Sequence, residues 1–213
     1  MISFSTLSMR AELTRAVTEM GFETPTPIQQ LVIPHLISSP ADIIGLAQTG
    51  TGKTAAFVIP VLERIDFTQK HLQCLMLAPT RELAIQITNE INKLGKHLNV
   101  SAITVYGGDS IEKQLKLLKN NPQIVVGTPG RCLDMIKRKK LKLDQIGFFV
   151  LDEVDEMLNM GFLDDVEFIA EKMPKEKQTL LFSATMPDRI KRISNQFLVD
   201  PLHIKVDAKS LTV

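Results

Sequence analysis

Ala47-Gln48-Thr49-Gly50-Thr51-Gly52-Lys53-Thr54 is the stretch that decides the fold of this chain. An apolar run of strand length, Asp42 to Ala47, leads into it, and Lys53 to Arg64 continues it with apolar residues at helical spacing. A strand, a glycine-rich loop and the start of a helix therefore follow one another within a few residues. This order is typical of a phosphate-binding loop in an α/β protein.

The residues of this loop have the chemistry that the phosphates of a nucleotide require. Gly50 and Gly52 let backbone N–H groups close around phosphate oxygens, and the helix N-terminus adds positive potential. Lys53 can reach the β- and γ-phosphates, and the Thr54 hydroxyl can ligate Mg²⁺. Ala47 stands where the generic pattern has its first glycine, so a plain turn with a solvated lysine is the alternative. The strand before the loop and the helix after it favour phosphate binding.

Short apolar runs of the same kind recur along the chain, and helical patterns lie between them. The runs lack polar alternation, as expected for strands that are covered on both faces. Alternating strands and helices predict an α/β fold with an open, mostly parallel sheet and helices on both faces. Ligands of such sheets bind beyond the carboxyl ends of the strands. The later runs are Cys74 to Ala78, Val100 to Tyr106, Gln123 to Gly127, Gly147 to Leu151, Thr179 to Phe182 and His203 to Val206, and further helices are expected over Thr80 to Lys96 and Ile111 to Lys119.

Length and composition favour one domain with an N-terminal arm. A chain of 213 residues, 44% of them apolar, can fill one sizeable core. We expect the arm over residues 1–30, where an amphipathic helix from Leu7 to Met20 precedes a turn-rich stretch from Gly21 to Pro27. The phosphate-binding domain is expected over residues 31–213.

Several classes of protein are excluded. Met1 to Phe4 has no basic stretch before an apolar core, so we expect no signal peptide. The apolar runs fall far short of the ~20 residues that a membrane span needs, so we expect no membrane contact. Cys74 and Cys132 lack metal-ligand spacing and are expected to be inert thiols of a cytoplasmic protein. A net charge of +1 leaves any nucleic-acid binding to a local patch.

A carboxylate cluster follows another apolar run directly. Phe148 to Leu151 leads into Asp152-Glu153-Val154-Asp155. A carboxylate at the tip of a buried strand beside a phosphate loop can hold Mg²⁺, partly through water, and the next one can polarise an attacking water. Asp152 takes the first role and Glu153 the second. The alternative is a set of acidic residues in the first turn of a helix, which the helix dipole also favours.

With these motifs in place, the chain resembles the DEAD-box family of ATP-dependent RNA helicases over nearly its whole length. It would form the first of that family's two RecA-like domains. The family typically has alanine at the first position of its phosphate loop, which accounts for Ala47. The matching segments are Gly21 to Gln29 with the upstream aromatic Phe4, Ala47 to Thr54, Pro79 to Ala84, Gly107-Gly108, Thr128 to Arg131, Asp152 to Asp155, and Ser183 to Thr185.

The resemblance implies ATP and Mg²⁺ as ligands. Gln29 would read the N6/N7 edge of adenine with its amide and Phe22 would stack on the base, so GTP would be rejected. Without the other motifs, Gly21 to Pro27 would be read as a proline-stiffened turn. The implied nucleotide contacts are Phe22, Thr24, Gln29, Gln48, Thr49, Gly50, Thr51, Gly52, Lys53 and Thr54, with Thr54 and Asp152 at Mg²⁺. The implied catalytic residues are Lys53, Asp152, Glu153, Ser183 and Thr185.

An RNA-binding rim is implied as well. Contacts to sugar and phosphate carry little base information, so RNA binding would be largely independent of sequence. Thr128-Pro129 also suits a helix start, with Thr as the cap and Pro at the first helical position. Taken singly, Arg81 and Arg131 would more often form surface salt bridges, but the set favours RNA. The implied contacts are Pro79, Thr80, Arg81, Gly107, Gly108, Thr128, Gly130 and Arg131.

Two features do not follow from the resemblance. Val154 replaces the alanine that gives the family its name, and its two extra methyl groups at a strand-to-helix corner can overpack their surroundings. The basic run Lys137 to Lys142 is by default a solvated helix end, whose cations the helix dipole stabilises. An auxiliary RNA-binding patch is the alternative.

The family's reaction needs a second RecA-like domain, and this chain is expected to end near a domain boundary at Lys209 to Val213. No segment resembles the arginine-rich motif that reaches the γ-phosphate from that domain. We therefore expect a monomeric half of a helicase that separates short RNA duplexes. An ATP-gated RNA clamp would use the same motifs. A small-molecule kinase would leave the adenine and RNA motifs unexplained.

Overall fold

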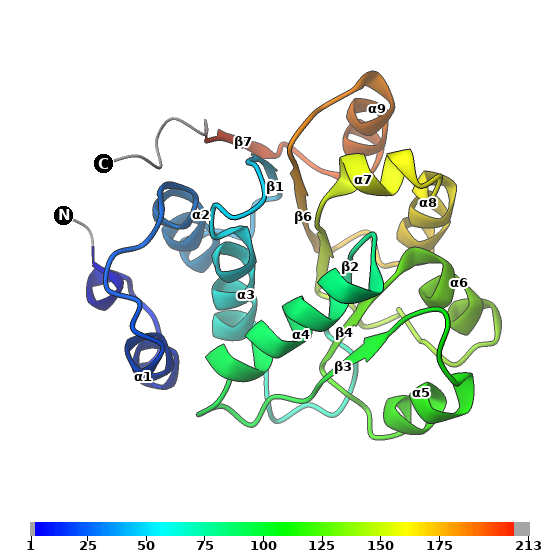
Figure 1. Cartoon of the computed structure of the whole chain (residues 1–213), viewed down its shortest axis with the longest axis horizontal. Helices are drawn as coiled ribbons and strands as arrows, with labels where there is room; N and C mark the ends of the chain where they lie inside the picture. Colours follow the sequence, from blue (N-terminus) through cyan, green and yellow to red (C-terminus); the bar gives the residue numbers. More distant parts are fainter. Residues whose placement is uncertain (1–2, 207–213) are drawn as a thin grey trace.

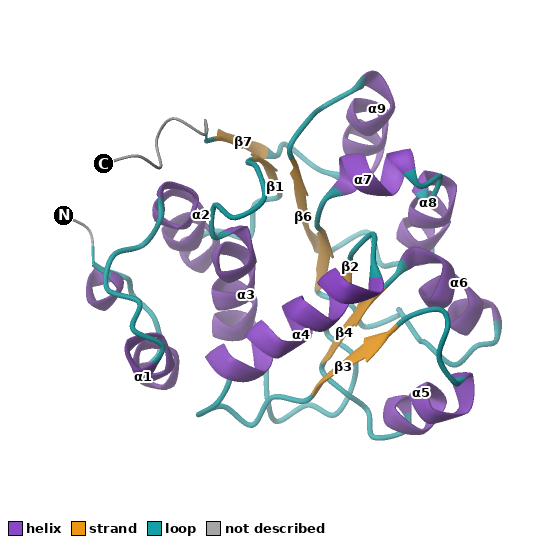
Figure 2. Ribbon diagram, viewed as in Figure 1, coloured by secondary structure: helices purple, strands orange, loops and turns teal. Residues whose placement is uncertain are grey.

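The chain folds around one parallel sheet, as its alternating pattern predicts (Figures 1 and 2). The computed structural model describes residues 3–206, so the boundary expected at Lys209 to Val213 lies outside the described residues. Neighbouring strands are parallel throughout the order β3-β4-β2-β5-β6-β1-β7. The strands are β1 (Ile43–Leu46), β2 (Cys74–Leu77), β3 (Ala102–Val105), β4 (Ile124–Gly127), β5 (Phe148–Leu151), β6 (Gln178–Ser183) and β7 (Leu202–Lys205).

The register of the strands brings their carboxyl ends to one edge. Leu77 at the end of β2 lies opposite Gly127 of β4 and Leu151 of β5, and Leu46 at the end of β1 lies opposite Ser183 of β6. Each loop that leaves one of these strands therefore starts from the same edge. We call this edge the carboxyl rim.

Helices cover both faces of the sheet and bury apolar stripes there. One face is covered by α2 to α4, with α1 packed on α3 and α4, and the other by α5 to α9; each layer forms its own hydrophobic cluster with the sheet (Figure 1). The helices are α1 (Ala11–Glu19), α2 (Pro27–Ser38), α3 (Lys53–Arg64), α4 (Arg81–Leu94), α5 (Ile111–Leu118), α6 (Pro129–Lys137), α7 (Val154–Asn159), α8 (Leu163–Glu171) and α9 (Asp188–Phe197).

The N-terminal arm differs in detail from the expectation. The helix expected from Leu7 to Met20 is shorter, since α1 begins only at Ala11 and a 3-10 turn, Phe4–Thr6, precedes it. Helix α2 runs across residue 30, so the arm continues into the first helix that packs on the sheet without a break.

The two cysteines are buried and free. Burial raises the pKa of both thiols, that of Cys132 to about 12. They are therefore thiols rather than thiolates at neutral pH. As for membranes, every helix in residues 3–206 is too short or too polar to cross a bilayer.

Candidate functional site

A hollow of about 290 Å³ lies at the carboxyl rim between the arm, the phosphate loop and the end of β5. Three distant parts of the sequence meet there, each positioned by an element that packs on the sheet. We call it the nucleotide hollow. The predicted site residues that line it are Phe22, Gln29, Thr49, Gly50, Gly52, Lys53, Thr54, Asp152 and Glu153.

The glycines of the loop are required by its backbone. Gly50 and Gly52 have φ angles of 80° and 86°, in the left-handed region that side chains disfavour. A Cβ on Gly52 would lie 2.6 Å from Nε2 of Gln29, so glycine alone fits there. Helix α3 then begins at Lys53, as predicted, and its first N–H groups have no partner within the helix. The loop therefore fits a phosphate group.

Gln29 connects the arm to the phosphate loop. Its Oε1 accepts a hydrogen bond from the backbone N–H of Thr26 at 2.9 Å, and its Nε2 donates to the carbonyl of Gly52 at 3.1 Å. A glutamine amide has two acceptor sites and two donor hydrogens. One of each remains for a ligand, which is the pair that the edge of adenine requires.

Lys53 and Asp152 form a buried ion pair in the nucleotide hollow. Nζ of Lys53 lies 3.6 Å from Oδ1 of Asp152, and both side chains are at least 95% buried. Burial raises the pKa of Asp152 to about 6; the charge of Lys53 lowers it and that of Glu153 raises it. Two opposite charges are thus held out of water at the bottom of the hollow. This arrangement is costly to build and is typical of functional sites.

The oxygen ligands in the hollow suit Mg²⁺. The carboxylate of Asp152 and the hydroxyl of Thr54 line the same space, and a hard cation prefers oxygen ligands. Within residues 3–206, no group of three or more His, Cys, Asp or Glu side chains is placed to hold a metal ion by itself. This agrees with a cation that is completed by water and phosphate oxygens.

Glu153 is held in a strained conformation beside the loop. Its φ angle is 54°, a left-handed value that is uncommon for glutamate. The Thr49 hydroxyl donates a hydrogen bond of 3.1 Å to its Oε1. Such strain tends to persist where a side chain must be aimed. Here it directs the carboxylate toward the phosphate loop.

Ser183 and Thr185 lie outside the nucleotide hollow and contact Asp155. The Asp155 carboxylate accepts hydrogen bonds from the Thr185 N–H at 3.0 Å and hydroxyl at 3.1 Å, and the Asp155 N–H donates to the Ser183 hydroxyl at 3.2 Å. Partial burial raises the pKa of Asp155, but the bonds from Ser183 and Thr185 outweigh it and hold the pKa below its usual value. The start of α7, which follows β5, is therefore linked to the end of β6.

Some of the predicted nucleotide contacts do not line the nucleotide hollow, and some residues that line it were not predicted. Thr24 and Gln48 do not line it, and the Thr51 side chain is buried, with its hydroxyl donating to the Gln48 carbonyl at 2.8 Å. The sequence reasoning missed four lining residues, Ala55, Leu83, Gln86 and Glu90. The last three lie on one face of α4, at the spacing of a helix. This spacing groups them on one face, but it does not show that the face meets the hollow.

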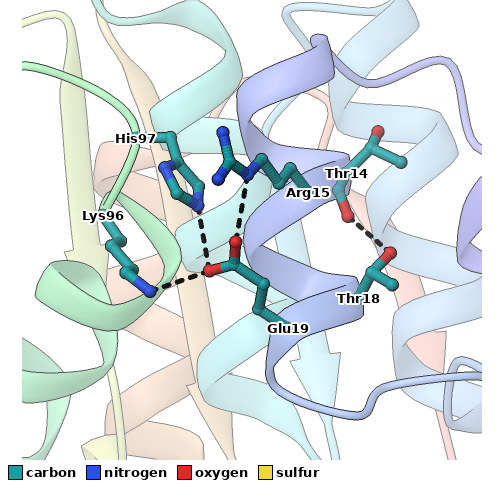
Figure 3. A network of polar contacts seen from close by, with 6 residues as sticks. All are labelled: Thr14, Arg15, Thr18, Glu19, Lys96 and His97. Atoms are coloured by element: carbon teal, nitrogen blue, oxygen red, sulfur yellow. Dashed lines mark hydrogen bonds and ion pairs between the residues drawn. The ribbon is translucent and has the colours of Figure 1, made fainter.

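Contacts at both ends of α1 hold the arm. At its start, the guanidinium of Arg10 contacts Glu63. At its end, the carboxylate of Glu19 accepts hydrogen bonds from Lys96 at 2.8 Å and His97 at 3.0 Å, beyond α4 (Figure 3). These hydrogen bonds lower the pKa of Glu19 to about 2, and the bond from Lys96 has the larger effect.

The arm places Phe22 at the hollow. Phe22 follows the last turn of α1 by only a few residues, and its ring stacks on that of Phe4 with centroids 6.0 Å apart. The anchored helix therefore fixes the aromatic residue that was predicted to stack on the base.

The predicted RNA-binding residues lie along the carboxyl rim. They follow β2, β3 and β4, which are neighbours in the sheet. Gly107 and Gly108 are exposed, and a Cβ on either would meet no atom within 4 Å. A polymer can approach the backbone closely at this point.

Two arginines occupy this rim. The Arg81 guanidinium lies 4.6 Å from the ring centroid of Tyr106. Nη2 of Arg131 donates to the carbonyl of Asp109 at 3.2 Å, while its Nη1 is buried without a hydrogen-bond partner among the described residues. A buried guanidinium nitrogen without a partner is costly. Thr128 precedes α6 as predicted, but its hydroxyl makes no capping bond and remains available.

Val154 is fully buried as the first residue of α7. Val154→Ala would remove two methyl groups from a packed cluster, so we expect a loss of roughly 1–2 kcal/mol in the free energy of unfolding. Urea denaturation of both forms measures it. A more stable alanine variant would show instead that valine overpacks the corner.

The comparisons with known proteins agree with this geometry. Residues 26–193 match the DEAD/DEAH box helicase family. Over its whole length the chain is 52% identical to the DEAD-box ATP-dependent RNA helicase CshA of Bacillus cereus and 50% identical to that of Bacillus subtilis. It spans 40% and 43% of the length of these relatives.

Solved structures of DEAD-box proteins have the same fold. A DEAD box protein from Methanococcus jannaschii superposes with a TM-score of 0.93 at 42% identity, over 99% of this chain and 57% of that one. A hypothetical ATP-dependent RNA helicase from Sulfolobus tokodaii superposes with a TM-score of 0.86 at 34% identity, over 93% of this chain and 57% of that one. The fold, the phosphate loop and the family match agree, and the chain belongs to the DEAD/DEAH box helicase family.

Proposed function

We propose that this chain is the nucleotide-binding part of an ATP-dependent RNA helicase. It binds ATP with Mg²⁺, grips the RNA backbone at the carboxyl rim, and acts with a second RecA-like domain to separate short duplexes. One observation carries the proposal: Gln29, Lys53 and Asp152, from three distant segments, line a single hollow.

In this proposal, different residues of the hollow bind the base, the phosphates and the Mg²⁺ of ATP. Phe22 and Gln29 take the base, the glycine loop takes the phosphates, and Lys53 turns from Asp152 to a phosphate oxygen. Thr24, Gln48 and Thr51 contribute from outside the hollow, by shaping the two loops. Thr54 and Asp152 hold Mg²⁺, which lowers the negative charge on the phosphates when bound.

The catalytic residues act on water and on domain closure. Glu153 accepts a proton from the attacking water, and its strained backbone keeps the carboxylate in place. Ser183 and Thr185 position the site through Asp155, because their hydrogen bonds join the end of β6 to the start of α7, two residues after Glu153. A movement of the end of β6 is thereby passed to the segment that carries Glu153.

RNA is held by its backbone in this proposal, without reading of bases. The exposed glycines allow close approach, and the half-buried guanidinium of Arg131 pairs with a phosphate oxygen. The full set is Pro79, Thr80, Arg81, Gly107, Gly108, Thr128, Gly130 and Arg131.

The organisation proposed here is an arm over residues 1–30 and a RecA-like domain over 31–213, joined in the complete protein to a second such domain. We place the protein in the cytoplasm and expect residues 1–213 alone to be monomeric. The chain covers 40–57% of the length of these relatives and solved structures, so each of them is long enough to include a second domain of similar size.

Gln29→Ala tests the adenine assignment. The variant loses the free donor and acceptor that face the base, so ATP should bind roughly tenfold more weakly and the preference over GTP should shrink. Titration of ATP and GTP onto both forms measures this. Gln30→Ala is the matched control, because that amide donates to the Pro25 carbonyl and does not line the hollow. Equal affinity of the unmodified chain for ATP and GTP would refute the assignment.

A further inference from the structure

A second hollow, of about 1000 Å³, lies away from the nucleotide hollow on the face covered by α5 to α9. One wall is α5 with the turn that follows it, and the other is the segment 140–145 beyond α6. The two hollows share no lining residue. We call the second one the basic groove.

Four exposed lysines line the basic groove: Lys116, Lys119, Lys140 and Lys142. Within residues 3–206, none of them has a carboxylate within ion-pair distance. The lining also holds two acidic residues, Asp144 and Glu112, and the latter accepts a hydrogen bond from the Ser110 hydroxyl at 2.8 Å. Lysines therefore outnumber carboxylates by four to two, and the groove carries an excess of positive charge.

A solvated helix end explains only part of this charge. Lys116 lies in the last turn of α5 and Lys119 caps it, so the helix dipole stabilises both. Helix α6, however, ends at Lys137, and Lys139 leaves it with a φ angle of 57°. Lys140 and Lys142 lie beyond that turn and gain nothing from the dipole, whose effect fades within the last turn.

The basic groove begins beside the carboxyl rim. Glu112 lines it and lies in the first turn of α5, which follows the loop that leaves β3 at this rim. The rest of the lining lies toward the opposite edge of the sheet, in segments that precede β2, β4 and β5. The groove then follows α5, whose eight residues span about 12 Å. A few nucleotides of an RNA strand cover that distance.

The lining favours a phosphate backbone over a protein segment. The apolar side chains of the lining are largely covered: Leu141 is only 4% exposed, and Leu72 and Leu118 are half-buried against the core below. The four lysines are exposed and have no ion-pair partner among the described residues, so an anionic chain meets positive charge first. In the described part of the chain, no Phe, Tyr or Trp lines the groove and His71 supplies a single ring, so bases have little to stack on.

We propose that the basic groove is an accessory RNA-binding site that holds the phosphates of a strand as it leaves the carboxyl rim. The inference rests on the proposed function, because the rim must first bind RNA. Lysine binds phosphate as a point charge, so the contact would be independent of sequence. The groove would strengthen the binding of long RNAs over short ones.

The experiment compares two double variants of the complete protein. Lys119→Gln with Lys142→Gln removes two charges from the groove. Lys93→Gln with Lys175→Gln removes two exposed lysines that do not line it, and so matches the change in net charge. Affinity is measured against salt for the shortest single-stranded RNA that the unmodified protein binds, and for the same RNA extended at either end.

For the extended RNA, the groove variant should lower the slope of log affinity against log salt by about 1.4, and its affinity should fall roughly 20-fold near 0.1 M salt. Its affinity for the short RNA and its basal ATP hydrolysis should stay unchanged, as should all affinities of the control variant. An equal loss on both RNAs, or no gain from extension in the unmodified protein, would overturn the proposal.

Two further outcomes separate the competing explanations. No loss on the extended RNA would also overturn the proposal and leave an acidic protein segment as the occupant to test. If the unmodified protein binds neither RNA, and RNA does not stimulate its ATP hydrolysis, the proposed function fails as well.

Discussion

The complete two-domain protein should hydrolyse ATP in the presence of RNA roughly 10³–10⁵ times faster than residues 1–213 alone. Phosphoryl transfer needs cations around the developing charge, and an arginine from another domain can supply that factor. Among the described residues, Lys53 is the only cation that lines the nucleotide hollow. In the proposed function the carboxyl rim also forms only one side of the RNA site. Residues 1–213 should therefore bind ADP but turn over ATP very slowly.

The measurement is ATP hydrolysis by both proteins with and without RNA, together with displacement of a short duplex strand. Both activities should appear only in the two-domain protein. Lys53→Ala in the two-domain protein serves as the inactive control, since it removes the phosphate grip. Strong RNA stimulation in residues 1–213 would mean that their own arginines complete the site, and the two-part mechanism would be wrong.

Glu153→Gln in the two-domain protein should lower turnover by a factor on the order of 10² or more, with ATP binding retained. The amide keeps the shape of the side chain and still offers an oxygen to the Thr49 hydroxyl, but it cannot accept a proton from water. Steady-state hydrolysis and nucleotide titration on the same samples separate the two effects.

Glu156→Gln is the matched control for this variant. It makes the same chemical change on α7, at an exposed position outside the nucleotide hollow. Its turnover should remain close to that of the unmodified protein. Normal hydrolysis by the Glu153 variant would exclude Glu153 as the base.

The sequence predicted those parts of the structure that depend on neighbouring residues. Apolar runs without polar alternation located the strands to within one or two residues, and Lys53–Arg64 has the helix bounds that its spacing predicted. The sequence predicted the phosphate loop from its glycines, and the left-handed backbone angles of Gly50 and Gly52 favour glycine over other residues. Each of these signals is local.

Features that depend on long-range packing could not be predicted. The strand order β3-β4-β2-β5-β6-β1-β7 decides which loops meet, and no periodicity encodes it. The approach of Gln86 and Glu90 to the hollow depends on how α4 lies against α3. Thr51 matched the loop motif as well as Thr49 did, yet it is buried while Thr49 faces Glu153.

The position of Gln29 has a consequence for small molecules that compete with ATP. One amide bonds to the backbone of both Thr26, in the arm segment proposed to contact adenine, and the phosphate loop, so ordering either segment helps to order the other. A fragment that binds either segment alone must therefore also help to order the other segment. A molecule that joins the two fragments orders both segments only once, so it gains more affinity than its separate fragments would suggest. A compound that fills only the adenine side would still prepare the loop that receives phosphate. Fragment affinities measured one at a time would therefore underestimate a linked inhibitor of this site.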